Sequence, residues 1–195
     1  MTRSARVERQ TKETRIDLRL DLDGSGLVEL ATGIGFFDHM LTHLAHHAGW
    51  DLSVRAEGDL HVDGHHTVED VGLALGQALA QALGDKAGIQ RFGSCTLPMD
   101  DVLATVAVDL SGRPFLVWKA DIPPGLLGTF DAELGREFWQ ALASAARMNV
   151  HVVVHHGCNR HHQLEAIFKA AARALRQAVT HDPRATSIPS TKGVL

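Results

Sequence analysis

The sequence contains no tyrosine and only two cysteines, Cys95 and Cys158, which lie far apart and form no C-x-x-C pair. A framework of disulfide bonds is therefore not expected. No apolar run approaches the roughly 20 residues that a membrane-spanning helix needs. The first residues, MTRSARVERQTKE, lack the apolar stretch of a signal peptide, so we expect a cytoplasmic location.

A strong charge of either sign is also absent. The formal net charge is -4 over 195 residues, which gives no reason to expect binding to nucleic acid or to a membrane surface. With 45% hydrophobic and 22% charged residues, the chain has the composition of a globular protein that can bury a core. Histidine, by contrast, is abundant: there are 13, and most fall within 39–66 and 151–162.

The hydrophobic pattern predicts the same order of elements twice. In the first half, alternation predicts strands at 15–22, 27–32 and 51–57, and helical spacing predicts helices at 36–48 and 66–83. In the second half, the same criteria predict strands at 101–110, 114–120 and 149–155 and helices at 133–147 and 161–180. The order β-β-α-β-α therefore occurs twice.

The residues themselves support a duplication. At an offset of 96, HHTVE at 65–69 aligns with HHQLE at 161–165, and at an offset of 98, Leu44 aligns with Leu142 and Val54 with Val152. Matches in the same order along two helices and a strand indicate an internal repeat. We expect a single catalytic domain, 1–195, made of a first half at 9–92 and a second half at 93–195 that includes the C-terminal tail.

The repeated His-His-x-x-Glu sequence, called here the HHxxE motif, has the geometry of a metal-binding segment. On a helix, each histidine lies within about 60° of the glutamate, whereas the two histidines diverge by about 100°. The two histidines of one motif therefore suit two different ions. Imidazole and carboxylate ligands together favour zinc, manganese, iron or nickel.

Two further candidate ligands occupy aligned positions on the other predicted helix of each half: His39 and Glu137. Together with the motifs they give eight ligands, His39, His65, His66, Glu69, Glu137, His161, His162 and Glu165. Four protein ligands on an octahedral ion leave two positions open, as catalysis requires.

Simpler interpretations exist for these residues. A single HHxxE motif is also typical of an exposed polar helix start, and its recurrence is what favours metal binding. His39 alone also fits a half-buried histidine, and Glu137 an exposed glutamate. The remaining histidines of the two clusters fit a solvent-facing or pocket-lining role (His43, His46 and His47) or a surface or loop position (His155 and His156).

A second group of residues suggests an anion site. Arg91 follows a Gly-Ile turn, Arg113 lies in an SGRP turn, and the tail carries Ser190, Thr191 and Lys192. Guanidinium, ammonium and hydroxyl groups on loops commonly bind phosphate. Taken one at a time, each of these side chains also fits a solvated surface position.

Several segments together resemble one known family. GIGFFDHML, DGHHTVEDVGLALG, RFGSCTLPMDD, DLSGRP, HHQLEAIFKAAARALRQA and PSTKG are similar to imidazoleglycerol-phosphate dehydratase of histidine biosynthesis, from about Arg9 to Leu195. The resemblance implies a duplicated α+β fold of the ribosomal protein S5 domain 2-like class, in which each half is a four-stranded sheet with two helices on one face. It also implies a hydro-lyase that converts D-erythro-imidazole glycerol phosphate to imidazole acetol phosphate.

The resemblance further implies a dinuclear manganese site that binds the substrate as imidazole or imidazolate, in a homo-oligomer of 24 subunits with sites between subunits. One Mn²⁺ would take His39, His66, His161 and Glu165, and the other His65, Glu69, Glu137 and His162. Typical members carry histidine at the position of Glu137, so the role of this residue and the charge of the site are in question.

Roles for the other residues follow from the same resemblance. Catalytic roles are expected for Glu13, Glu69 and Glu165, with Glu13 as a general acid or base. Contacts with the phosphate substrate are expected from Glu13, His39, His65, Arg91, Arg113, His161, Lys169, Ser190, Thr191 and Lys192. Two other classes fit the histidine clusters: a protein that stores or carries metal, and a dinuclear metallohydrolase, although the latter more often uses bridging aspartates and the motifs contain none.

Overall fold

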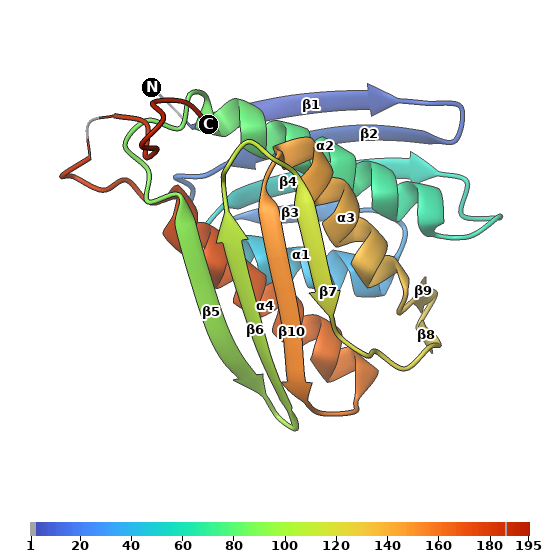
Figure 1. The fold of residues 1–195 in the computed structure, drawn as a ribbon. Helices are drawn as coiled ribbons and strands as arrows, with labels where there is room; N and C mark the ends of the chain where they lie inside the picture. Colours follow the sequence, from blue (N-terminus) through green and yellow to red (C-terminus); the bar gives the residue numbers. More distant parts are fainter. Residues whose placement is uncertain (1–2, 186) are drawn as a thin grey trace.

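The computed structural model describes residues 3–185 and 187–195 and contains two sheets with the same topology (Figure 1). The elements of the first half are β1 (Ser4–Gln10), β2 (Thr14–Asp21), β3 (Val28–Ala31), α1 (Gly35–Ala48), β4 (Asp51–Gly58) and α2 (His65–Leu83). Those of the second half are β5 (Phe92–Met99), β6 (Val102–Asp109), β7 (Phe115–Lys119), the short pair β8 (Leu126–Leu127) and β9 (Phe130–Asp131), α3 (Leu134–Ala146), β10 (Asn149–His156) and α4 (Arg160–Val179).

The α+β duplication is confirmed by the order of the strands. One sheet runs β1-β2-β4-β3 and the other runs β5-β6-β10-β7. In both sheets the last pair is parallel, β3 with β4 and β7 with β10, and the other pairs are antiparallel. Each half therefore has the four-stranded sheet that the family resemblance implies.

Each half begins with one strand, β1 or β5, that the hydrophobic pattern does not predict. This strand precedes the predicted order β-β-α-β-α and brings each sheet to four strands. Strands β1 and β5 lie at the sheet edges, where one side of the strand has no neighbour. Only Val7 is fully buried in β1, whereas β5 alternates with Cys95, Leu97 and Met99 half-buried but is interrupted by Gly93 and Pro98. Their pairing with β2 and β6 nevertheless gives regular antiparallel registers.

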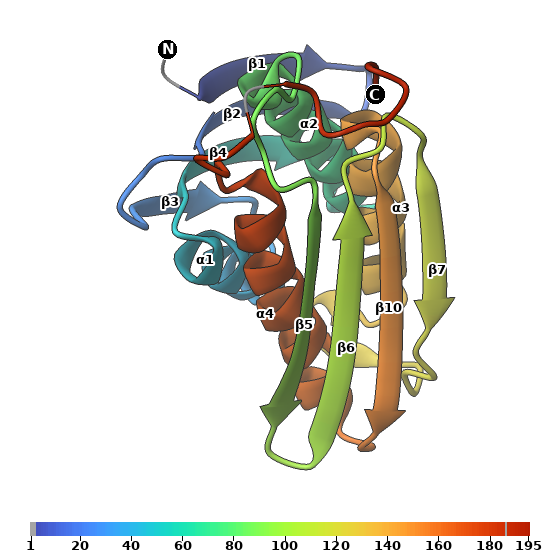
Figure 2. The same cartoon turned by 60° about the vertical axis from the view of Figure 1, so that its left-hand side comes forward.

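The four helices lie between the two sheets (Figures 1 and 2). In the first half α1 and α2 cover one face of the sheet, and in the second half α3 and α4 do the same. The halves meet through helix pairs, α2 against α3 and α1 against α4. Large buried side chains fill the layer, among them Phe37, Trp50, Phe138, Trp139 and Phe168. The duplication therefore brings α1 of one half beside α4 of the other.

Two glycines allow α2 and α3 to approach closely. A Cβ at Gly72 would lie 2.8 Å from the carbonyl oxygen of Phe138, and one at Gly76 would lie 2.7 Å from that of Leu142. Both contacts are with backbone, which has little room to move.

Replacing Gly76 by alanine is expected to destabilise the fold by about 1–3 kcal/mol, because overpacking outweighs the helix propensity that alanine adds. Denaturant unfolding at a fixed protein concentration measures the change. Gly35→Ala is the matched control, since no atom lies within 4 Å of a Cβ there. Equal stability of the two variants would show that the close approach of α2 and α3 has no energetic role.

Among the described residues, no helix combines the length and the apolar character that crossing a membrane requires.

Candidate active site

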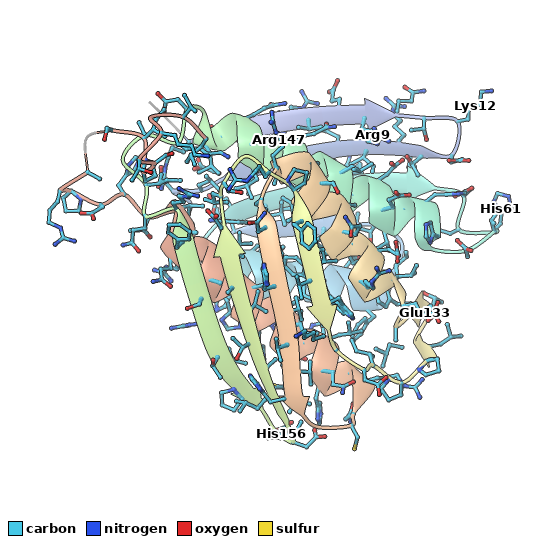
Figure 3. The ribbon with its side chains drawn as sticks, viewed as in Figure 1. Arg9, Lys12, His61, Glu133, Arg147 and His156 are labelled. Carbon is cyan, nitrogen blue, oxygen red and sulfur yellow. The ribbon has the colours of Figure 1, made fainter. Side chains whose placement is uncertain are left out.

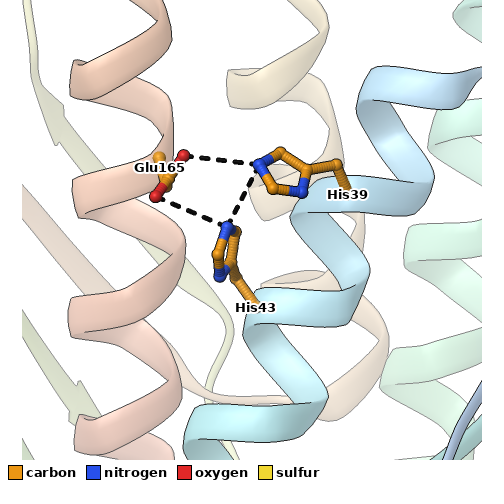
Figure 4. A group of neighbouring side chains, drawn as sticks. All are labelled: His39, His43 and Glu165. Carbon is orange, nitrogen blue, oxygen red and sulfur yellow. Dashed lines mark hydrogen bonds and ion pairs between the residues drawn. The ribbon is translucent and has the colours of Figure 1, made fainter.

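The first site element lies where α1 packs against the start of α4 (Figure 4). Glu165 Oε2 lies 3.0 Å from His161 Nε2 and 3.4 Å from His39 Nε2. Glu165 Oε1 lies 3.4 Å from His43 Nε2. These four side chains are called the Glu165 cluster below. It joins three expected ligands from both halves of the chain, His39, His161 and Glu165, and adds a third histidine, His43, whose role the sequence leaves open.

The electrostatics of the cluster favour a bound cation. Glu165 is 5% exposed, and burial alone would raise the pKa of its carboxyl group. A hydrogen bond from Lys169 and the nearby His43 oppose burial and lower this pKa to about 2. Burial lowers the pKa of His43 to about 4, so its imidazole is neutral at pH 7. An ionised carboxylate beside a neutral imidazole is a donor set that fits a divalent transition-metal ion.

The second site element lies at the start of α2. His65 Nε2 is 3.8 Å from Glu69 Oε2, one helical turn further along. His66 points elsewhere: its Nδ1 lies 2.9 Å from Asp59 Oδ2, and its Nε2 lies 4.0 Å from Glu13 Oε1. The two histidines of this HHxxE motif therefore diverge as their helical spacing predicts.

The second histidine of the other motif is held in the same way. His162 Nδ1 lies 2.7 Å from Asp101 Oδ1. The side chain of Asn159 caps α4 by accepting hydrogen bonds from the backbone N–H groups of His161 and His162, which fixes the start of this helix. In both motifs the first histidine contacts the glutamate, and the second is bound through Nδ1 by an aspartate.

The sequence pattern gives no indication of these two aspartates, which the fold places beside candidate ligands. Asp59 precedes His66 by seven residues, and Asp101 lies 61 residues before His162. Each carboxylate, through its hydrogen bond with the histidine, has a pKa below its usual range, and the same bond raises the pKa of His66. A carboxylate on Nδ1 leaves Nε2 as the nitrogen that can bind a metal.

Glu137 makes no hydrogen bond or ion pair with another expected ligand among the residues that the structure describes. It lies in the first turn of α3, where its Oε1 is 3.2 Å from Arg136 Nη1. It lines a hollow of about 280 Å³ together with Trp118 and Ala132. Within the described part of the chain, only His39, His43 and Glu165 form a group of three candidate ligands whose donor atoms all lie within 4.8 Å of one another.

Glu13 is positioned by the tight turn between β1 and β2. Thr11 Oγ1 accepts hydrogen bonds from the backbone N–H groups of Glu13 and Thr14, at 3.1 and 3.0 Å. The turn is anchored to α2 because both Thr14 and Arg9 bind the buried carboxylate of Asp70. Figure 3 shows Lys12, in this turn, on the same side of the molecule as His61, in the loop before α2.

The residues of the expected anion site lie near one another. Arg91 has a positive φ of 70°, and its guanidinium binds Asp109 and donates to the carbonyl oxygen of Pro189 in the tail, at 2.9 Å. The end of the tail reaches the Arg113 turn, since a Cβ at Gly112 would lie 2.6 Å from the backbone of Leu195. Ser190 is half-buried, whereas Arg113, Thr191 and Lys192 are exposed.

The anion residues are remote from the Glu165 cluster of the same chain. The backbone N–H of Arg91 binds the carbonyl oxygen of Ala178, at the C-terminal end of α4. His161 is at the opposite end of this helix, about 25 Å away at 1.5 Å per residue. Figures 1 and 2 both show the tail and the start of α4 at opposite ends of the second half.

Comparison with known proteins gives one family. A family model described as imidazoleglycerol-phosphate dehydratase matches residues 32–175. The imidazoleglycerol-phosphate dehydratase of Roseobacter denitrificans is 60% identical over 194 residues, which cover 99% of this chain and 100% of the relative. Crystal structures of the enzymes of Staphylococcus aureus and Pyrococcus furiosus each align with a TM-score of 0.84 at 38% identity. The alignments cover 92% and 97% of this chain and 99% and 100% of those chains, respectively.

Proposed function

We propose that this chain removes water from D-erythro-imidazole glycerol phosphate to give imidazole acetol phosphate. The chain belongs to the imidazoleglycerol-phosphate dehydratase family and is therefore a hydro-lyase of histidine biosynthesis, which supports this proposal. The observation that carries the site assignment is the division of the two HHxxE motifs. In each motif the first histidine faces its glutamate, and an aspartate turns the second histidine toward another partner.

This division supports two metal ions per site, each with ligands from two chains. One ion would take His39, His161 and Glu165 of one chain and the equivalent of His66 from a neighbour. The other would take His65, Glu69 and Glu137 of that neighbour and His162 of the first chain. The donors are imidazole nitrogens and carboxylate oxygens, a combination that accommodates Mn²⁺ as well as other divalent transition-metal ions. Bound ions would supply Lewis acidity toward the imidazole ring of the substrate.

The remote anion residues support the same arrangement. A three-carbon chain with a ring at one end and a phosphate at the other is too short to reach from His161 to Arg91 of one subunit. Arg91, Arg113, Ser190, Thr191 and Lys192 would therefore hold the phosphate of a substrate whose ring lies at the Glu165 cluster of another subunit. We propose on this basis that the active unit is a closed homo-oligomer, as in the 24-subunit assembly that the family resemblance implies.

Glu13 is the proposed general acid or base. Its side chain is 53% exposed in the single chain, and its Oε1 lies 4.0 Å from His66 Nε2. Glu13 would therefore lie beside the ion that His66 shares with the ligands of a neighbouring chain. The Thr11 turn holds its backbone, and its carboxylate would act on the carbon-bound hydrogen or the departing hydroxyl. Lys169, which binds Glu165, would keep that carboxylate ionised and contact the substrate.

An assay of imidazole glycerol phosphate turnover tests the proposed function. Protein treated with chelator should be inactive, and added Mn²⁺ should restore the formation of imidazole acetol phosphate. Turnover that is unaffected by complete metal removal would refute the metal-dependent mechanism, and the absence of turnover in the Mn²⁺-loaded protein would refute the dehydratase assignment.

Asp101→Asn is expected to weaken Mn²⁺ binding by about 10–100-fold, because an amide no longer fixes the proton of His162 on Nδ1. Equilibrium dialysis with metal analysis measures this change. Asp85→Asn, at an exposed aspartate outside the site, serves as the control. If both variants bind Mn²⁺ as tightly as the wild type, Asp101 does not orient a ligand.

A further inference from the structure

His43 is an imidazole within the Glu165 cluster that neither proposed ligand set uses. It follows His39 by one helical turn on α1, so the two side chains share a face. Its Nε2 lies 3.2 Å from His39 Nε2 and 3.4 Å from Glu165 Oε1 (Figure 4). Its side chain is 18% exposed, against 46% for His39, so His43 is the deeper of the two histidines.

Packing directs the ring of His43 into the cluster. The ring stacks on that of His47 at a centroid distance of 5.8 Å and an interplanar angle of 13°. Metal–nitrogen bonds of about 2.1 Å place neighbouring donors about 3–4 Å apart, which is the spacing of His43, His39 and the carboxylate. The three side chains are therefore arranged as donors around one ion would be.

The set of donors that one chain brings together differs from the set proposed for the assembled site. Within the described residues, only His39, His43 and Glu165 have donor atoms all within 4.8 Å of one another. His161 contacts the carboxylate and does not join this group, and His66 is bound to Asp59. Lys169 donates to Oε1 of Glu165, the oxygen that lies 3.4 Å from His43 Nε2, and Oε2 lies 3.4 Å from His39 Nε2.

We propose that His39, His43 and Glu165 form a loading site for one divalent transition-metal ion. The ion binds these three side chains while the site lacks its neighbouring subunit, and His43 gives way to His161 and the neighbour's histidine on assembly. The inference rests on the proposed function for the final ligand set, and it adds a ligand that this set does not contain.

The test uses the full-length chain with His66→Ala and His161→Ala, which removes two ligands of the assembled set and leaves the loading site intact. After treatment with chelator, this double variant is titrated with Mn²⁺ alone and followed by electron paramagnetic resonance. Adding His43→Gln is expected to remove one bound ion per chain or to weaken its binding at least about 100-fold, since loss of a mere orienting partner costs about 10–100-fold. His46→Gln, on the exposed side of α1, should change nothing.

Equal Mn²⁺ binding with and without His43 would overturn the proposal. If the His43→Gln chain fails to fold by circular dichroism, pulsed electron paramagnetic resonance on the double variant and on its His43→Asn form decides, because the number of coordinated imidazole nitrogens must fall by one. Turnover of the wild type is measured separately. A wild type without dehydratase activity would refute the proposed function, whereas the titration would still decide the role of His43.

Discussion

Replacing Glu165 by glutamine is expected to lower dehydratase turnover by at least about 100-fold and to remove one of the two Mn²⁺ ions per site. The carboxamide carries no charge, and its N–H₂ group would face the imidazoles of His39 and His161, which now lie 3.4 and 3.0 Å from Oε2. Lys169 would also lose its anionic partner in a largely buried position. Turnover and metal content, measured on the same preparation, check both expectations.

Glu29→Gln is the control, since this exposed glutamate lies on β3, outside the proposed site. It should leave turnover and metal content unchanged. A Glu165→Gln enzyme that keeps two ions and normal turnover would remove Glu165 from the site.

Replacing Glu13 by glutamine is expected to lower turnover by about 100–10,000-fold, the range typical of a general acid or base, with the metal content unchanged. The separation of the two effects is expected because Glu13 belongs to neither proposed ligand set and its Oε1 lies 4.0 Å from His66 Nε2, beyond the distance of a shared ligand bond. The limb of the pH–rate profile that belongs to the missing group should also disappear.

Glu57→Gln, an exposed glutamate on β4, controls for a general effect of lost charge. A Glu13→Gln enzyme with turnover near that of the wild type would show that another group moves the proton. Loss of metal together with activity would instead identify Glu13 as a ligand.

Much of the fold follows from local patterns in the sequence. All four helices begin and end within about two residues of their predicted bounds, because each has an apolar stripe. The end of α1 is also marked by Gly49, whose φ is 75°. The repeat was visible because HHTVE and HHQLE occupy the same position in both halves. The apolar pattern does not predict the edge strands β1 and β5, because β1 buries only Val7 fully and β5 contains Gly93 and Pro98.

The site was predictable in composition and only partly in geometry. Helical spacing correctly separated the directions of His65 and His66. It gave no signal for Asp101, whose partner His162 is brought close only by the fold, nor for the depth of His43 between α1 and α4. Glu137 shows the same limit of sequence spacing. The internal repeat aligns it with the candidate ligand His39, but in the single chain its carboxylate contacts Arg136.

The comparisons settle the class among the alternatives that the sequence left open. A protein that stores metal and a dinuclear metallohydrolase both fit the histidine clusters, whereas the full-length relatives are named as a dehydratase. The anion residues agree with this class, since Arg91 and the tail form a group that metal storage would not need.

The central claim is that each active site combines the Glu165 cluster of one subunit with the start of α2 of another. The most direct test mixes two inactive variants, Glu165→Gln and Glu69→Gln, which are unfolded together, refolded together and confirmed as mixed oligomers by native mass spectrometry. Random mixing should restore about one quarter of wild-type turnover, because about one site in four receives both intact halves. Mixing Glu165→Gln with His161→Ala should restore none, because both changes damage the same half. Mixed oligomers of the first pair without activity would contradict the account.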